Sequence, residues 1–263
     1  MLSDTAIRYG AGRRIEAASL PVTAAYAVML LAVSVILTAL GPRTRDLVVS
    51  QMSTNLHNLA HGHWHTLVGS AFVSAGGDVY FWLPALTCLL ALGELFWRSK
   101  GLVAAFAVGH IGATGIVTVW LVAAVKTGWL PVSVARASDV GISYGAVCVL
   151  GALSGSVPLR WRPAWIGWWL GIAVVAAAGG DFTAIGHIVA LLLGIGLSFR
   201  LRSATRWTPI HVALLVVGAA FGFFMLSGSS LLALGGGLTG ALIPSAFRRG
   251  SGWRSRVESL ARA

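Results

Sequence analysis

Charged residues and cysteines are scarce in this chain of 263 residues. Only 10% of the residues are charged, eight are acidic, and 57% are hydrophobic. Most long segments would therefore expose more apolar surface than one water-soluble core can bury. The two cysteines, Cys88 and Cys148, both fall inside apolar runs, which argues against a disulfide-stabilised secreted domain. The composition predicts a protein that is embedded in lipid.

Apolar runs of about the length that crosses a bilayer recur along the chain. A hydrocarbon core of roughly 30 Å requires about 20 apolar residues in a helix. Because lipid offers no partner to backbone groups, each run is predicted to be helical. The predicted fold class is therefore all-α, a polytopic membrane helical bundle. The expected spans are 21–41, 80–97, 101–125, 141–158, 164–180, 183–200, 208–226 and 229–246.

The net charge of +11 is a signal of membrane topology rather than of nucleic-acid binding, because the basic residues lie between the spans. If the N-terminus is cytoplasmic, only four of the 19 basic residues lie outside: Arg43, Arg45, Lys126 and Arg136. Cytoplasmic segments of membrane proteins are enriched in Lys and Arg. We therefore expect both termini in the cytoplasm and some attraction to anionic lipid.

This topology divides the chain into three parts. We expect a cytoplasmic N-terminal tail at 1–20, one integral membrane domain at 21–246, and a basic cytoplasmic C-terminal tail at 247–263. The composition, rich in arginine and alanine, suggests a bacterial source, and hence the bacterial inner (plasma) membrane.

The outer segment from about 42 to 79 is the only long stretch outside the spans. The apolar piece within it, 67–73, is too short to cross a bilayer and is predicted to be interfacial or re-entrant. Upstream, His57, His61 and His65 would share one face if that segment were helical, and three imidazoles could bind zinc or copper. The alternative is contact with lipid headgroups beside Trp64.

Ionisable side chains inside spans are costly and are therefore candidates for function. Glu94 and His211 lie near cytoplasmic ends, where a structural role is expected, and His110 is expected to hydrogen-bond a neighbouring helix. His187 stands out because Ser143 lies at nearly the same depth. Spans four and six run in the same direction, and the two residues differ by about 3 Å in distance from the outer surface.

A serine hydroxyl and an imidazole at one depth permit nucleophilic catalysis, because the imidazole can accept the hydroxyl proton. Ser143 also lies at a predicted helix N-terminus, whose amides could stabilise an oxyanion. Gly141 and Gly145 on either side would permit close approach of a substrate. A small-x-Ser-x-Gly string is also common in helix packing, so both interpretations stay open.

These residues resemble the rhomboid family of intramembrane serine proteases. In that family the nucleophile lies in a Gly-x-Ser motif on span four and the base in a His-x-x-Gly-x-x-x-Gly motif on span six. The corresponding strings here are Gly141-Ile142-Ser143 and 187–194, which begins with His187 and ends with Gly194. The outer segment 69–77 and Gly93-Glu94 also look like the family. The resemblance implies a six-span core over about 20–200, followed by two additional spans.

The chain departs from the family pattern at the site itself. The family's nucleophile is usually followed by glycine, whereas Tyr144 follows Ser143, and the aromatic expected four residues after the serine is Val147. The positions that correspond to the family's oxyanion donors on span two hold Asp78 and Trp82. A carboxylate repels an oxyanion and an indole has one donor, so the loss could cost about 2–4 kcal/mol of barrier. In span six, Ala190 replaces the first glycine after the histidine.

The resemblance implies an intramembrane serine protease that cleaves transmembrane proteins near the outer leaflet. His187 would deprotonate Ser143, the amide of Ser143 would hold the oxyanion, and Tyr144 could assist. The first alternative is an inactive rhomboid-like protein that binds transmembrane helices, and the second is an unrelated multi-pass transporter. The proteolytic scheme requires no metal or organic cofactor, and the expected partners are transmembrane proteins and membrane lipid, not nucleic acid.

Overall fold

The computed structural model describes residues 20–74, 79–136, 142–179, 182–203, 206–227 and 231–243. The expected tails lie outside these residues, apart from Leu20, and so do Asp78 and Gly141. The longer helices are α1 (Pro21–Ala39), α5 (Val79–Ala107), α6 (Ala113–Lys126), α7 (Ile142–Ala152), α8 (Arg162–Ala177), α9 (Phe182–Leu197), α10 (Pro209–Ser227) and a last helix, Leu232–Ile243. The described part of the chain has no strand, and the predicted all-α fold class is confirmed.

Every expected span falls on a helix, although the spans are not equally long. Among the described residues, three helical stretches are long and apolar enough to cross a membrane: Pro21–Ala39, Val79–Lys126 and Pro209–Ser227. The second contains two expected spans, because α5 is two helices joined at Arg98, where φ is 61° and ψ is 174°. Ile142–Gly155, Phe182–Leu197 and Leu232–Ile243 are shorter apolar helices.

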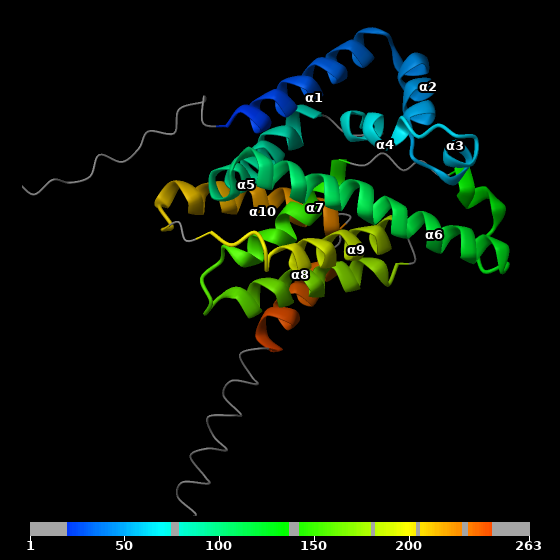
Figure 1. Cartoon of the computed structure of the whole chain (residues 1–263). Coiled ribbons are helices and arrows are strands. Elements are labelled where there is room, and N and C mark those ends of the chain that lie inside the picture. The colour runs from blue at the N-terminus through cyan, green and yellow to red at the C-terminus, as the bar shows by residue number, and fades with distance from the viewer. Residues whose placement is uncertain are drawn as a thin grey trace, which may run out of the picture.

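The helix α7 lies at the centre of the bundle and is surrounded by α5, α9 and α10 (Figure 1). Its residues from Tyr144 to Ala152 are all buried. Glycines allow the closest contact, which is with α9: a Cβ on Gly194 would overlap the carbonyl oxygen of Cys148, and one on Gly151 would overlap that of Leu191. Backbone contact of this kind is typical of membrane helices with small residues at their interface.

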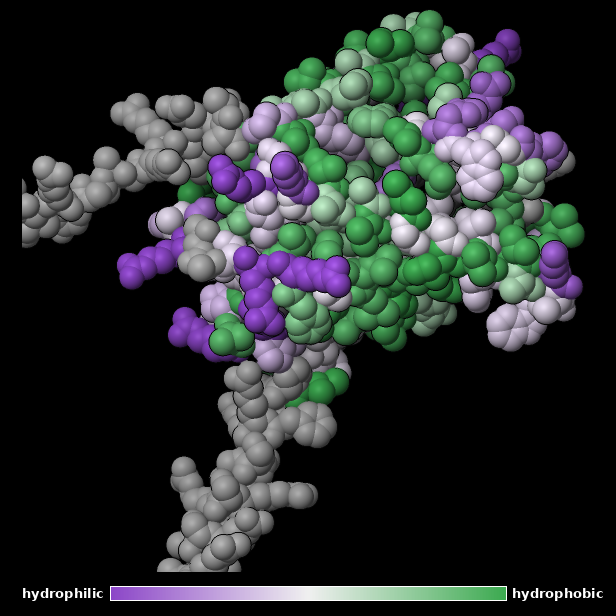
Figure 2. All heavy atoms as spheres, viewed as in Figure 1, coloured by the Kyte–Doolittle hydropathy of each residue, from purple (hydrophilic) through white to green (hydrophobic). Residues whose placement is uncertain are grey.

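The molecular surface has the polarity expected of a protein that crosses a bilayer. Hydrophilic side chains gather at two opposite ends, and hydrophobic side chains cover most of the surface between them (Figure 2). Exposed residues of this apolar region include Val28 in α1, Val119 in α6 and Val216 in α10. In water these side chains would be costly to expose, whereas lipid solvates them.

The outer segment is folded rather than extended. It contains α2 (Pro42–Met52), α3 (Leu56–Ala60), α4 (Thr66–Gly69) and a 3₁₀ turn, η2 (Ser70–Phe72). The apolar piece that was predicted to be interfacial or re-entrant turns into the protein, because Ala71 and Val73 are buried and Ser70 is fully buried. The hydroxyl of Tyr26 in α1 donates to the carbonyl oxygen of Ala71 at 2.6 Å.

The interior contacts of this segment converge on His110. The chain between α5 and α6 is a π-helical segment, η3 (Val108–Gly112), and it turns His110 inward. The Nε2 atom of His110 lies 2.8 Å from the carbonyl oxygen of Leu67 and 3.3 Å from Oγ of Ser70. The hydroxyl of Thr54 donates to Oγ of Ser70 at 2.8 Å. Because a carbonyl only accepts, Nε2 carries the proton, and His110 joins the outer segment to span three.

Glu94 has the structural role that its position predicts. Its carboxylate accepts the backbone N–H groups of Val22 at 3.1 Å and Thr23 at 2.8 Å, and the hydroxyl of Ser99 at 2.7 Å. The first amides of a helix have no partner within that helix. Glu94 therefore supplies acceptors to the N-terminus of α1 and ties the first span to the second.

Candidate functional site

The contact between α7 and α9 places one aromatic side chain against His187. The ring of Tyr144 lies 5.4 Å from the imidazole, centre to centre, in an edge-on arrangement at 82°. Gly186 makes room for the ring, because a Cβ there would overlap the phenol of Tyr144. Both Tyr144 and His187 are buried. The outer end of this interface is therefore a closely packed pair of Tyr144 and His187.

Ser143 occupies a different side of α7. It precedes Tyr144 by one residue, so its Cβ is rotated by about 100° around the helix axis relative to that of Tyr144. The face of α7 that contacts α9 contains Tyr144, Cys148 and Gly151, at the spacing of one helix face. Ser143 lies off this face and is half-buried.

The remaining predicted site residues are spread over the bundle. Gly145 faces the ring of Phe106 rather than α9, since a Cβ at Gly145 would lie 2.6 Å from that ring. Trp82 is buried in α5, where its ring lies 6.1 Å from that of Phe221 in α10. Gly141 lies outside the described residues. Of the residues predicted from the sequence, the structure thus brings together Tyr144 and His187.

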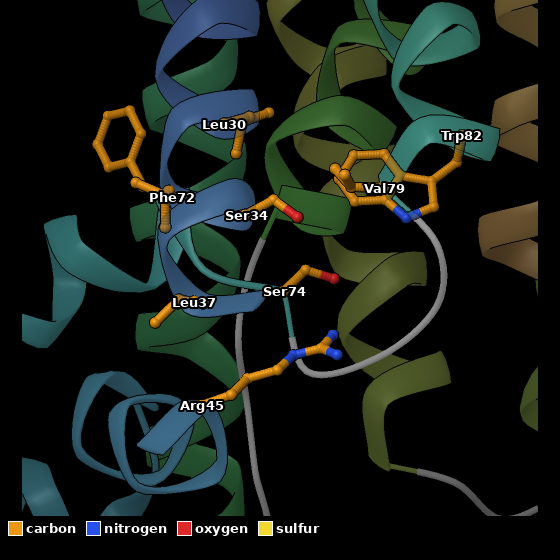
Figure 3. A pocket seen from close by; sticks show the side chains of 9 residues that line it. Leu30, Ser34, Leu37, Arg45, Phe72, Ser74, Val79 and Trp82 are labelled. Atoms are coloured by element: carbon orange, nitrogen blue, oxygen red, sulfur yellow. The ribbon is translucent and has the colours of Figure 1, made fainter. Parts of the chain in front are cut away.

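Trp82 also lines a small cavity of about 20 Å³ between α1, α2 and α5. The polar ends of Ser34, Ser74 and Arg45 point into the space beside Val79 and Trp82 (Figure 3). A cavity of this size with several polar groups has room for about one water molecule. It is too small for a segment of a protein substrate.

The helix α10 covers the side of α7 that is turned away from α9. Gly222 of α10 packs against the side chain of Leu150, and Gly218 packs against the backbone of Leu89 in α5. Leu150 lies seven residues after Ser143 and hence on nearly the same side of α7, about 10 Å deeper. The outer end of α10, with Leu226 and Ser227 buried, therefore extends toward the level of Ser143.

The outer histidines are not arranged as three ligands. The helix α3 ends at Ala60, and Gly62 adopts a φ of +80°, so the segment is not the single helix that would align His57, His61 and His65. The rings of His57 and His61 lie 4.3 Å apart, whereas His65 lies beside His63 at 5.6 Å. Within the described ranges, no group of three or more His, Cys, Asp or Glu side chains could hold a metal ion.

A family model of rhomboid-like proteins matches residues 16–207, which is most of the chain. This chain belongs to the rhomboid-like family. No curated protein and no solved structure matches it. The rhomboid-like match extends past the end of α9 and stops just before α10, so α10 and Leu232–Ile243 are additional to the family core. The interpretation as a transporter unrelated to rhomboids is therefore wrong.

Proposed function

We propose that this rhomboid-like protein binds transmembrane segments of other membrane proteins without hydrolysing them. The observation that carries the proposal is the contact of Tyr144 with His187. In the family pattern, an aromatic residue follows the nucleophile by four positions, one helical turn later. If Tyr144 is that aromatic, the position of the nucleophile is Val140, which has no atom that can attack a carbonyl.

The same alignment resolves a second departure from the family pattern. The family's nucleophile is followed directly by glycine, and Gly141 directly follows Val140. With Ser143 as the nucleophile, neither the glycine nor the aromatic is in place. With Val140 in that position, both are. In this alignment the nucleophile is lost, and Ser138 stands where the Gly-x-Ser motif has its glycine. The two matches that remain favour a protein that has kept the scaffold and not the reaction.

The packing of α10 supports the same conclusion. A substrate helix that approached Ser143 from the lipid would meet the outer end of α10, which packs against both α5 and α7. Hydrolysis there would require α10 to move away from two closely packed helices. Binding of a client helix to the outer surface of the bundle has no such requirement. Of the three long spanning stretches, α1 is the least buried and offers the most surface for it.

The orientation belongs to this proposal. We infer that both termini lie on the cytoplasmic side of a bacterial inner membrane, with 21–246 as one integral domain between two tails. The distribution of basic residues supports this orientation. The clients are then transmembrane proteins of the same membrane, and no nucleic acid is involved.

Proteolysis by Ser143 and His187 is the second candidate. It is favoured by the position of Ser143 in the first turn of α7, where backbone amides and the helix dipole can stabilise an oxyanion. In this mechanism His187 accepts the proton of the Ser143 hydroxyl, and the oxygen attacks the peptide carbonyl. His187 then protonates the leaving amine, and water hydrolyses the acyl-enzyme.

Labelling of the purified protein with a fluorophosphonate separates the two candidates, because this reagent forms a covalent bond only with an activated serine. We expect no labelling that depends on Ser143 in the wild-type protein, with Ser143→Ala as the matched control. Client binding is tested by a photo-crosslinking residue at Val28, which is 66% exposed in α1 and should crosslink to a client. The control is Val132, in the 3₁₀ helix η4 (Val132–Arg136) after α6, which should not. Labelling that disappears in Ser143→Ala would establish proteolysis instead.

A further inference from the structure

An apolar groove of about 930 Å³ lies between α8 and the last helix, Leu232–Ile243. The two helices cross at paired glycines: a Cβ on Gly167 would overlap the carbonyl oxygen of Gly240, and one on Gly171 would overlap that of Gly236. These four glycines allow the two backbones to touch, and they also line the groove. The groove beside them is lined mainly by apolar side chains, among them Leu170 and Val174.

One end of this groove carries a positive charge. Arg162, the first residue of α8, lines the groove. One terminal nitrogen of its guanidinium donates to the carbonyl oxygen of Gly155 at 2.9 Å, which fixes the group in place. The same nitrogen also donates to the carbonyl oxygen of Val157 at 3.4 Å. The N-terminus of α8 has no side-chain cap, and its helix dipole favours an anion at the same end.

The charged end lies where the membrane surface is expected. Leu159 and Trp161 next to it are exposed, and tryptophan is enriched at the headgroup level of membranes. The groove follows α8 from Arg162 to Val175, a helical rise of about 20 Å. One leaflet of the hydrocarbon core is about 15 Å thick, half of a bilayer core. The groove therefore has the length of one acyl chain below a headgroup.

We propose that the groove holds one anionic phospholipid of the cytoplasmic leaflet, with its phosphate at Arg162 and an acyl chain along α8. A transmembrane helix is a poorer fit, because an apolar helix offers no anion to the guanidinium of Arg162 at the end of the groove, whereas a phosphate does. The charge of the surroundings agrees with an anionic headgroup. The sequence that follows Ile243 contains five arginines.

The test is native mass spectrometry of the full chain, released from detergent with added lipid. We expect one phosphatidylglycerol to stay bound, with phosphatidylcholine bound more weakly and soluble glycerol phosphate not retained. Arg162→Gln should weaken phosphatidylglycerol binding by roughly five- to tenfold, the effect of one basic residue at a membrane surface or slightly more. Arg162→Lys should keep most of the affinity. Thr239→Phe, which places a ring in the groove, should weaken binding while every positive charge remains.

Arg160→Gln is the matched control, because Arg160 neighbours Arg162 in sequence and lies outside the lining of the groove. Thermal unfolding of each variant in a zwitterionic detergent shows whether it is folded. Equal retention of phosphatidylglycerol by the wild-type chain and by folded Arg162→Gln would overturn the proposal. Equal loss in Arg160→Gln and Arg162→Gln would also overturn it, because the attraction would then belong to the whole surface. Retention of phosphatidylglycerol does not depend on whether Ser143 reacts, so this test is separate from that of the proposed function.

Discussion

At the centre of this rhomboid-like bundle, the chemistry depends on which side chain of α7 contacts His187 in α9. The sequence predicted that Ser143 and His187 lie at one depth, and depth follows from residue counting alone. It could not predict which side chain of α7 faces α9, because the rotation of a helix is set by the glycines on both helices and by the fit of large side chains. That rotation places Tyr144 on His187. The sequence did contain one signal of this arrangement: Gly141 and Tyr144 follow Val140 by one and four residues, as the glycine and the aromatic follow the nucleophile in the family pattern.

A gain of reactivity would test the role of Val140. If Val140 occupies the position of the nucleophile, Val140→Ser should gain labelling by a fluorophosphonate. Labelling should be lost again in the double variant with His187→Ala, because the hydroxyl then lacks a base. It should persist in the double variant with Ser143→Ala. Labelling of Val140→Ser that is independent of His187 would contradict this assignment.

Glu94 is the residue whose loss should affect stability most directly. Glu94→Ala leaves the amides of Val22 and Thr23 without their acceptors in a buried setting, and we expect a loss of about 2–4 kcal/mol. Reversible unfolding of the purified protein in mixed detergent measures this change. Glu94→Gln keeps one acceptor oxygen, so its free energy of unfolding should lie between those of the wild-type protein and Glu94→Ala. Ser50→Ala, at an exposed hydroxyl in α2, is the control and should have no effect. If Glu94→Ala matches this control, the carboxylate does not hold α1.

At the scale of the elements, the sequence predicted the spans well and the connections poorly. Apolar length identifies a span because lipid enforces it. It does not show that the second and third spans join at one residue, Arg98, or that the outer segment folds into short helices. These depend on contacts between distant residues, such as that of His110 with Leu67. The outer histidines show the same limit, because a turn at Gly62 interrupts the helix on which His57, His61 and His65 would have shared one face.

The connection through His110 predicts a local effect rather than a global one. In His110→Leu the carbonyl oxygen of Leu67 loses its contact with the imidazole, and the hydroxyl of Ser70 keeps only Thr54 as a partner. We expect faster hydrogen exchange at the amides of α3 and α4, with little change in α7 and α9. His110→Gln can still donate one hydrogen bond and should recover part of the protection. Unchanged exchange in the outer segment of His110→Leu would show that other contacts hold it.

The contact between α7 and α9 offers two glycines on one helix with opposite surroundings. A methyl group on Gly194 would overlap the backbone of α7, whereas Gly196 has nothing within 4 Å of its added Cβ. Gly194→Ala should therefore cost about 1–3 kcal/mol of stability, and Gly196→Ala should be neutral or slightly stabilising. The same unfolding measurement compares them. Equal stability of the two variants would mean that α7 and α9 are farther apart than this contact requires.

At the scale of the whole molecule, we expect the basic residues to set the orientation in the membrane, and this orientation decides on which side every site lies. Membrane-impermeant thiol reagents test it in intact cells, in a Cys88→Ser background that leaves the buried Cys148 in place. Trp129→Cys, beyond the end of α6, should be labelled from outside, and Leu159→Cys, before α8, only after permeabilisation.

Leu231→Cys tests whether the two added helices cross the membrane, because it lies between α10 and the last helix and is 80% exposed. If both added helices cross the membrane, Leu231→Cys is labelled from outside. Labelling only after permeabilisation would mean that α10 does not cross, and Arg162 would then face a different leaflet from the end of the groove that Ile243 lines.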